Sequence, residues 1–156
     1  MTFINIVKKL ISQCKTISTM ESCTGGYIAS SITNIPGASD VLKFSAVTYS
    51  NEFKIKMGVD KNIIDKYSVY SIETANEMSK NIADFSNSNY GIGITGKLCS
   101  PDPNNPTDKN DIVYISIYNK DLDKYYEYSL EVKNQERYKN KELILEFIVD
   151  KLREIV

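Results

Sequence analysis

A short run of small and hydroxylic residues, Ser22-Cys23-Thr24-Gly25-Gly26, follows a β-type stretch at 15–20 and precedes a helical pattern that begins at Tyr27. A strand, glycine turn and helix in this order direct backbone N–H groups outward at a helix N-terminus, where the dipole adds partial positive charge. Such a turn can hold a phosphate or stabilise an oxyanion, and it presents the Ser22 hydroxyl beside those donors. A structural interpretation also stands, in which Ser22 or Thr24 only caps the helix and the glycines permit the turn.

A second polar run, Thr48-Tyr49-Ser50-Asn51-Glu52-Phe53-Lys54, lies where another predicted strand passes into a helix. Ligand sites in α/β sheets gather at the carboxyl ends of strands. We therefore expect Tyr49, Asn51 and Lys54 to face the same crevice as Ser22, although a lysine of this kind is more commonly a solvated surface residue. Thr95-Gly96 ends a third predicted strand, and it either lines that crevice or forms only a turn.

The composition restricts the chemistry of such a site. The chain has 156 residues, a formal net charge of -1 and no His. The lack of His excludes Ser-His-Asp and Cys-His catalytic sets and His-containing zinc sites, so a general base must be Lys, Asp, Glu, Tyr or Cys.

The near-zero net charge predicts no attraction to nucleic acid or to an anionic membrane. Three cysteines without a CxxC pair, together with an N-terminus that lacks a secretory signal, predict reduced thiols and a cytoplasmic protein.

The elements that must position these residues follow from hydrophobic periodicity. The pattern predicts helices over 3–14, from 27 onwards, over 51–57, 60–67, 71–85 and 135–155, and strands over 15–20, 41–49, 89–95, 112–119 and 124–132, the last two forming a hairpin. Helices interleaved with five strands predict an α/β fold, a three-layer α/β/α sandwich around a mixed, mostly parallel five-stranded sheet. We expect residues 1–156 to form a single domain, with residues 96–111 as a polar loop.

Four segments occur in an order and spacing that resemble the CinA C-terminal domain family. They are Glu21-Ser-Cys-Thr-Gly-Gly, Pro36-Gly-Ala-Ser, Val47-Thr-Tyr-Ser-Asn-Glu-Phe-Lys and Gly93-Ile-Thr-Gly. That family includes the stand-alone nicotinamide-mononucleotide deamidases. The resemblance extends from about residue 3 to 155, is dense between 17 and 60, and is thin after 97.

The resemblance implies an amidohydrolase that converts nicotinamide mononucleotide to nicotinic acid mononucleotide and ammonia, with no metal and no other cofactor. It also implies that the site is built from these motifs, and our hypothesis is that Ser22 is the nucleophile, that a neutral Lys54 is the base, and that Tyr49 orients Lys54 or relays the proton. Backbone N–H groups at Thr24, Gly25 and Gly26 would hold either the oxyanion or the 5′-phosphate. Further substrate contacts would come from Asn51, Thr95, Gly96 and Arg137. Cys23 is a rival nucleophile, but neighbouring side chains diverge, so we expect only one of Ser22 and Cys23 to face the crevice.

The chain departs from the family pattern after Thr95-Gly96. Lys97 and Leu98 stand where the family has small residues, and the following loop has lost its glycines. Gln135-Glu136-Arg137 replaces a Gly-Asp-Arg turn, and a later basic pair is reduced to Asn140-Lys141. These changes leave an alternative in which the chain is a catalytically weak nucleotide-binding or interaction module. The predicted partners are a small nucleotide and a second copy of the chain in a dimer, with no nucleic acid and no membrane.

Overall fold

One mixed sheet of five strands organises the computed structural model, which describes residues 2–107 and 109–156. The strands are β1 (Ile17–Glu21), β2 (Leu42–Val47), β3 (Tyr90–Gly96), β4 (Ile112–Asn119) and β5 (Lys124–Glu131), in the spatial order β2-β1-β3-β4-β5. β1 pairs in parallel with β2 and β3, whereas the pairs β3–β4 and β4–β5 are antiparallel. Every strand except β4 therefore runs in the same direction, as the prediction of a mixed, mostly parallel sheet requires.

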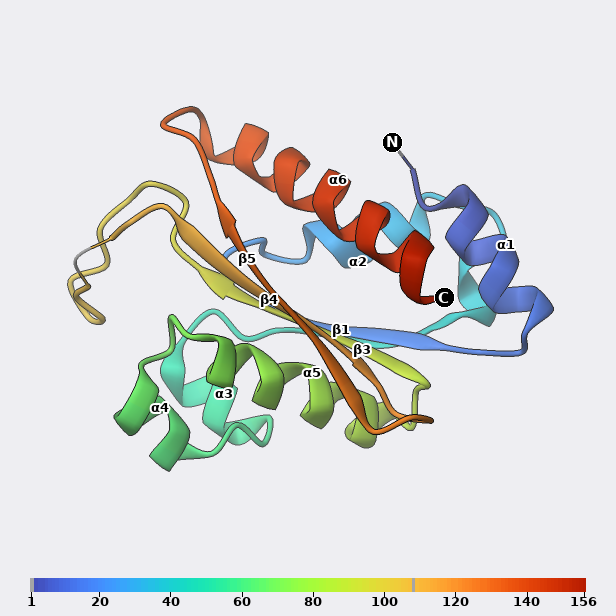
Figure 1. The fold of residues 1–156 in the computed structure, drawn as a ribbon, viewed down its shortest axis with the longest axis horizontal. Coiled ribbons are helices and arrows are strands. Elements are labelled where there is room, and N and C mark those ends of the chain that lie inside the picture. The colour runs from blue at the N-terminus through green and yellow to red at the C-terminus, as the bar shows by residue number, and fades with distance from the viewer. Residues whose placement is uncertain (1, 108) are drawn as a thin grey trace.

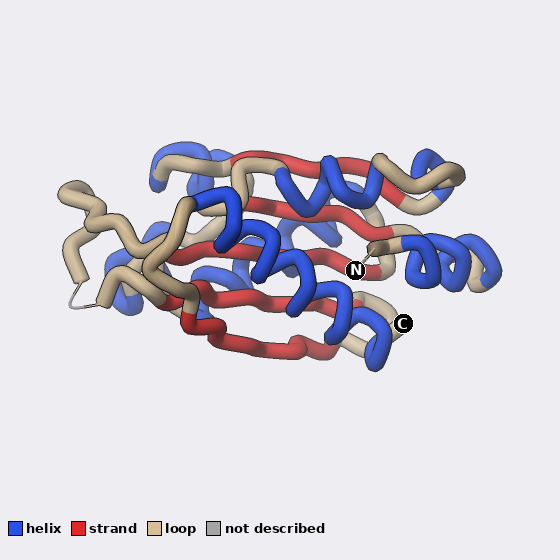
Figure 2. The backbone as a smooth tube through the Cα atoms, turned by 90° about the horizontal axis from the view of Figure 1, so that it is seen from above, coloured by secondary structure: helices blue, strands red, loops and turns tan. Residues whose placement is uncertain are grey.

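Helices cover both faces of this sheet (Figure 1). One face carries α1 (Ile4–Ser12), α2 (Tyr27–Thr33) and α6 (Arg137–Ile155), and the other carries α3 (Asn51–Lys56), α4 (Lys61–Tyr67) and α5 (Ile72–Ser86). Figure 2 shows α6 lying obliquely across the strands. The three-layer α/β/α prediction is confirmed. The segment between α2 and β2 also contains a short 3₁₀ turn, Ala38–Asp40.

Two apolar clusters hold the layers together because the central strands are buried on both faces. The larger cluster lies under α1, α2 and α6 and includes Ile17, Ile92 and Ile148. The smaller one lies under α5 and joins Met20 of β1 to Met78 and other side chains. All five residues of β1 are buried, which is typical of a central strand in a sheet covered on both sides.

Two glycines of β3 allow α5 to approach the sheet backbone closely. A Cβ atom at Gly91 would lie 2.0 Å from the carbonyl oxygen of Ser79, and one at Gly93 would lie 2.3 Å from that of Ala75. Any side chain at either position would push the helix away from the strand. The close packing of α5 on β3 therefore depends on both glycines.

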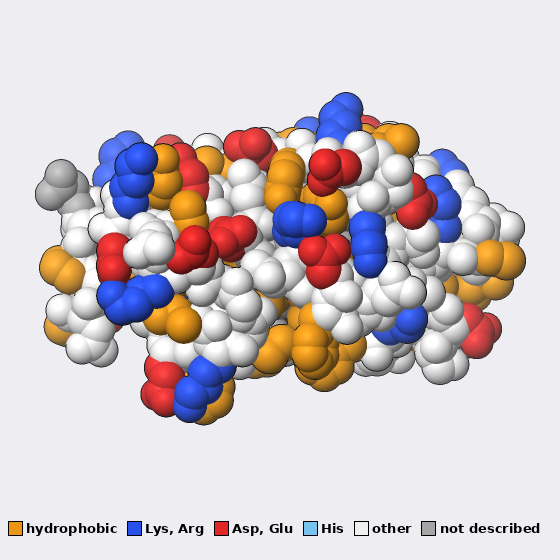
Figure 3. All heavy atoms as spheres, turned by 90° about the horizontal axis from the view of Figure 1, so that it is seen from below, with side chains coloured by type: hydrophobic (Ala, Val, Ile, Leu, Met, Phe, Trp, Pro, Cys, Tyr) orange, Lys and Arg blue, Asp and Glu red, His pale blue; other side chains and the backbone are white. Residues whose placement is uncertain are grey.

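Charged side chains of both signs are interspersed on the face that carries α3, α4 and α5 (Figure 3). Lys61 and Asp65 on α4, and Lys80 and Asp84 on α5, form ion pairs one helical turn apart. Such exposed pairs stabilise a helix by only about 0.2–0.5 kcal/mol each. Within the described residues, no helix is both long and apolar enough to cross a membrane.

The connections after β1 and β2 diverge at the carboxyl edge of the sheet. The chain leaves β1 for α2 on one face and leaves β2 for α3 on the opposite face. Adjacent parallel strands whose connections separate in this way leave a crevice between the two loops, where α/β proteins bind ligands. The carboxyl end of β3 lies beside that of β1, so three of the predicted motifs meet at this edge.

Candidate active site

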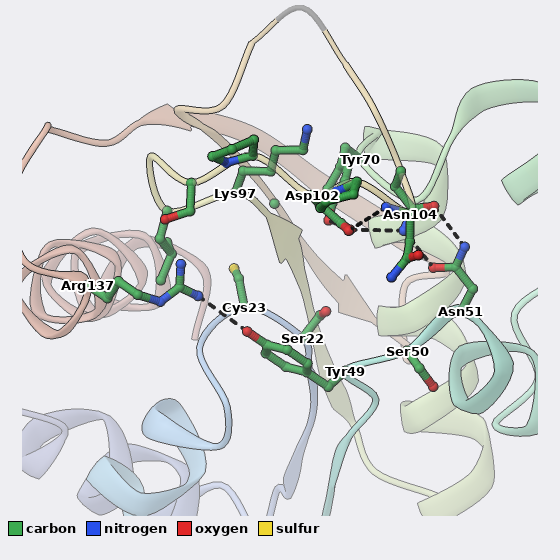
Figure 4. A pocket seen from close by; sticks show the side chains of 16 residues that line it. Ser22, Cys23, Tyr49, Ser50, Asn51, Tyr70, Lys97, Asp102, Asn104 and Arg137 are labelled. Atoms are coloured by element: carbon green, nitrogen blue, oxygen red, sulfur yellow. Dashed lines mark hydrogen bonds between the residues drawn. The ribbon is translucent and has the colours of Figure 1, made fainter.

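A pocket of about 560 Å³ opens at the carboxyl edge of the sheet. Its walls come from the turn after β1, the junction between β2 and α3, the loop 96–105, Tyr70 before α5, and Arg137 at the start of α6. Figure 4 shows Ser22, Cys23 and Tyr49 at one side of this space, with Arg137 and Asp102 on separate walls. Residues far apart in the sequence therefore share one site.

Lys54 lies beneath this pocket beside Ser22. Its side chain is only 2% exposed, its Nζ lies 2.9 Å from Ser22 Oγ, and it donates a hydrogen bond to the carbonyl oxygen of Thr48 at 2.7 Å. The interpretation of Lys54 as a solvated surface lysine is wrong, because α3 turns this residue inward. The Ser50 hydroxyl caps α3 by accepting from the Phe53 amide at 3.2 Å, which helps to hold the helix in that orientation.

Burial changes the protonation of Lys54. Loss of water around the ammonium group lowers the pKa of Lys54 from 10.5 to about 8, and the negative charge of Asp102 offsets part of this effect. No carboxylate of the described residues forms an ion pair with Lys54. A substantial fraction of this amine is therefore neutral near pH 8 and can accept the proton of the Ser22 hydroxyl.

Cys23 also lines the pocket, so the expectation that only one of Ser22 and Cys23 faces the crevice is wrong. The turn bends tightly enough to present both side chains. Burial raises the pKa of the Cys23 thiol to about 12, despite attraction from Lys54 and Arg137. Nucleophilic cysteines have depressed pKa values because the thiolate is the reactive form. The electrostatics of this site therefore favour Ser22 over Cys23 as the nucleophile.

Glu21, which ends β1, is a residue whose role the sequence patterns did not reveal. Its carboxylate is fully buried and accepts from the Thr24 hydroxyl at 2.6 Å, from the Ile28 amide at 2.9 Å and from the Ala29 amide at 3.0 Å. Glu21 therefore satisfies the second and third amides of α2. The interpretation of Ser22 or Thr24 as the cap of this helix is wrong. The sequence signal for this role was an acidic residue at the end of a predicted strand, shortly before the start of a predicted helix.

The glycine turn has a backbone that only glycine adopts easily. Gly25 and Gly26 have φ values of +61° and +93°. The Gly25 amide donates to the Ser22 carbonyl oxygen at 3.0 Å. The amides of Thr24 and Gly26 make no hydrogen bond within residues 2–107 and 109–156. The turn therefore keeps two donors near Ser22.

Arg137 and Tyr49 meet at the rim of the pocket. The Arg137 guanidinium donates to the Tyr49 hydroxyl at 3.3 Å, and Tyr49 is 64% exposed. Among the described residues Tyr49 makes no hydrogen bond to Lys54 or Ser22, and the Thr48 carbonyl orients the lysine instead. Lys141 lies one helical turn after Arg137, and its Nζ lies 3.6 Å from the position that a Cβ of residue 25 would take. The first turns of α6 thus bring two cations to this side of the site.

The loop after β3 is ordered by contacts with the pocket wall. Lys97 lines the pocket, is 5% exposed, donates to Asn110 Oδ1 at 3.1 Å and lies 5.0 Å from the centroid of the Tyr70 ring. Leu98 is buried in the larger apolar cluster. The residues that replace the small residues of the family pattern are therefore built into the wall and the core, and they rebuild this side of the pocket.

A profile of the CinA C-terminal domain matches residues 3–156. The chain belongs to the CinA C-terminal domain family. A protein of Clostridium kluyveri with the provisional name competence-damage inducible protein is 46% identical over 112 residues, which are 71% of this chain and 27% of that protein. A CinA-like protein of Kosmotoga olearia is 42% identical over 104 residues, 66% of this chain and 25% of that protein. The chain thus spans about a quarter of the length of these curated relatives.

Solved structures agree with this CinA fold. The competence/damage inducible protein CihA of Agrobacterium tumefaciens superposes with a TM-score of 0.86 at 24% identity, covering 96% of this chain and 90% of that one. A CinA superfamily protein of Escherichia coli superposes with a TM-score of 0.85 at 21% identity, covering 97% and 87%. At these identities the likeness shows the fold.

In this CinA domain the structure brings together only some of the residues predicted to form the site. Ser22, Tyr49, Asn51, Gly96 and Arg137 line the pocket, and Lys54 contacts Ser22 from below. The side chains of Thr24 and Thr95 are buried and bond within the protein, Thr24 to Glu21 and Thr95 to the Val69 carbonyl oxygen at 2.8 Å. Neither these threonines nor Gly25 and Gly26 belong to the pocket lining.

Proposed function

We propose that this CinA domain is an amidohydrolase that converts nicotinamide mononucleotide and water to nicotinic acid mononucleotide and ammonia. The observation that carries the proposal is the contact of 2.9 Å between Lys54 Nζ and Ser22 Oγ, formed by a buried lysine whose pKa is lowered to about 8. A Ser–Lys pair is an established variant of the nucleophile and base used for acyl transfer. The chain has no His that could serve instead.

The reaction follows from the roles of these two groups. Ser22 Oγ attacks the carboxamide carbon while neutral Lys54 takes the hydroxyl proton, giving a tetrahedral intermediate. Lys54 then returns that proton to the amide nitrogen, the C–N bond breaks, ammonia leaves, and an ester to Ser22 remains. Water attacks this ester with Lys54 again as the base. Lys54 then gives this proton to Ser22 Oγ as the C–O bond to Ser22 breaks, and the product leaves as an acid that loses its own proton to water, with the enzyme restored.

The two donor sets of the site suit different parts of this substrate. Glu21 already neutralises the start of α2, which disfavours a phosphate at the glycine turn. We therefore assign the free amides of Thr24 and Gly26 to the oxyanion, and Arg137, which lines the pocket, to the 5′-phosphate. Tyr49 accepts from Arg137, so its role in this proposal is to position the guanidinium. Asn51 and Gly96 contribute to the pocket wall.

The test is ammonia release from nicotinamide mononucleotide by the purified chain, with nicotinic acid mononucleotide measured as the second product. We expect both products in equal amounts, and we expect their loss in the Ser22→Ala variant. Tight binding of the nucleotide without ammonia release would instead support the non-catalytic module, which the rebuilt loop after Gly96 favours. Release of ammonia that is unchanged in Ser22→Ala would contradict the proposed nucleophile.

A further inference from the structure

Asp102 is a carboxylate on the pocket wall that the proposed chemistry does not use. It lies in the rebuilt loop, on a different wall from Arg137, with Ser22 and Cys23 at the side of the space between them (Figure 4). No Lys or Arg of the described residues forms an ion pair with it. The pocket therefore has a cationic wall at the start of α6, and the wall formed by the loop after β3 carries the carboxylate of Asp102 together with Lys97.

Three donors of the protein hold this carboxylate in place. Asp102 Oδ2 accepts from the Tyr70 hydroxyl at 2.5 Å and from Asn105 Nδ2 at 3.0 Å, and Oδ1 accepts from the Asn104 amide at 3.0 Å. These hydrogen bonds, that of Tyr70 first, hold the pKa of Asp102 below its usual value. Asn105 is in turn bonded to Asn51 at 2.8 Å, which ties the loop to α3. The carboxylate is thus ionised and fixed in direction.

A count of acceptor sites shows what Asp102 can still do. An ionised carboxylate offers about four lone-pair sites. The two bonds to Oδ2 and the one to Oδ1 occupy three of them, so one site on Oδ1 remains for a ligand. A carboxylate accepts hydrogen bonds only, and it repels phosphate. An O–H or N–H group of a ligand suits this remaining acceptor site.

We infer that Asp102 is a specificity-determining residue that accepts a hydrogen bond from a sugar hydroxyl, so that the site selects a ribose nucleotide over a deoxyribose one. The inference rests on the proposed function, in which the carboxamide lies at Ser22 and the phosphate at Arg137. The ribose, which joins these two groups, then supplies the remaining donors. An acidic side chain that binds a ribose hydroxyl is a general solution in nucleotide sites.

The test compares nicotinamide mononucleotide with its 2′-deoxy and 3′-deoxy forms. Binding is measured by titration calorimetry on the Ser22→Ala protein, and turnover on the protein with Ser22 intact. We expect at least one deoxy form to bind about 10–100-fold more weakly, the range for a hydrogen bond to a charged group. Asp102→Asn can keep the acceptor toward Tyr70, but it places an N–H where the free acceptor stood and removes the acceptor of the Asn104 amide. We expect it to weaken binding of the ribose form and to reduce the ribose-to-deoxyribose ratio to within about threefold.

Two control variants separate this effect from loss of charge or of loop structure. Asp65→Asn removes a surface carboxylate on α4, and Thr107→Ala changes an exposed residue of the same loop. Both should retain the full discrimination. Asp102→Glu keeps the charge but moves the oxygens by one methylene, and it should also lose discrimination, which provides a second variant if Asp102→Asn does not fold.

Each outcome separates the inference from the function on which it rests. Ammonia release with equal ribose-to-deoxyribose ratios in the Asp102 variants and the parent protein overturns the inference and leaves the proposed function intact. Discrimination that depends on Asp102 without ammonia release supports the inference and overturns the hydrolase. Absence of binding by all three nucleotides overturns both.

Discussion

Lys54 and Ser22, separated by 32 positions in the sequence, meet beneath the pocket with Nζ 2.9 Å from Oγ. Ser22 comes from the turn after β1, whereas Lys54 comes from α3, which follows β2. The parallel pairing of β1 and β2 brings these segments to the same edge of the sheet. This contact is therefore a consequence of sheet topology.

Replacing Lys54 should remove most of the catalytic activity. Lys54→Met keeps the length and apolar character of the buried chain but removes the amine that takes the Ser22 proton. General-base contributions are typically about 10²–10⁴-fold, so we expect kcat for ammonia release to fall by that range. Lys56→Ala is the control, because Lys56 lies on the same helix, is exposed and pairs with Glu52. A Lys54→Met protein with more than about a tenth of the parent rate would contradict the role of the base.

The rate of ammonia release should rise with pH. Only the neutral form of Lys54 accepts a proton, and its pKa is lowered to about 8. About a tenth of the lysine is neutral at pH 7 and about half at pH 8, so kcat/KM should increase nearly tenfold per unit below pH 7 and level off above pH 9. A profile measured from pH 6 to 10 with the parent protein checks this. A flat profile from pH 6 to 9 would point to a different base.

The same pKa shift predicts how stability depends on pH. The pKa of Lys54 is lower in the folded state than in the unfolded state, so between about pH 8 and 10.5 the unfolded chain binds more protons and stability rises with pH. The free energy of unfolding of the parent protein, relative to Lys54→Met, should increase by about 2 kcal/mol from pH 7 to pH 9.5. Urea denaturation of both proteins at the two pH values measures this difference. A relative stability that falls over this interval would mean that burial does not lower the lysine pKa.

Cys23 should be dispensable for hydrolysis. Its thiol stays protonated because burial raises the pKa to about 12. We expect Cys23→Ala to keep ammonia release within about tenfold of the parent, and we expect slow reaction with iodoacetamide, because the thiolate is the reactive form. Ser22→Ala, measured beside it, should lose the activity. An inactive Cys23→Ala protein beside an active Ser22→Ala protein would reverse the assignment.

Removing the charge of Glu21 should destabilise the fold. Glu21→Gln replaces one acceptor oxygen by an N–H group that faces the amides or hydroxyls now bonded to the carboxylate. Loss of buried hydrogen bonds to a charged group predicts a decrease of about 2–4 kcal/mol in the free energy of unfolding. Urea denaturation checks this, with Glu52→Gln on the surface of α3 as the control. Equal stability of the two variants would rule out the capping role of Glu21.

The elements of the fold were predictable because their signals are local. The hairpin strands predicted at 112–119 and 124–132 appear as Ile112–Asn119 and Lys124–Glu131, and the helix predicted over 71–85 appears as Ile72–Ser86. Ser71 caps that helix by accepting from the Thr74 amide at 3.1 Å. Alternation and capping residues act over a few positions, so one sequence is enough to read them.

The site was harder to predict, since several of its contacts join distant segments. The motifs placed Ser22 and Lys54 at one crevice, but they gave no sign that Glu21 satisfies two amides in the first turn of α2. They also did not show that Tyr49 bonds Arg137, 88 positions away, in place of Lys54. Thr24 and Thr95 look like site residues in the sequence, yet tertiary packing directs both hydroxyls into internal hydrogen bonds.

By itself the sequence determined the types and order of the elements, the family, and a chemistry without His that rests on hydroxyl, thiol and amine groups. These properties depend on residue identity and short spacings. Only the tertiary structure decided that Lys54 is buried with a lowered pKa, that the Cys23 thiol stays protonated and that Asp102 has one free acceptor site. Protonation and hydrogen-bond capacity depend on surrounding water, charge and donors, and these come from segments that meet only when the sheet forms.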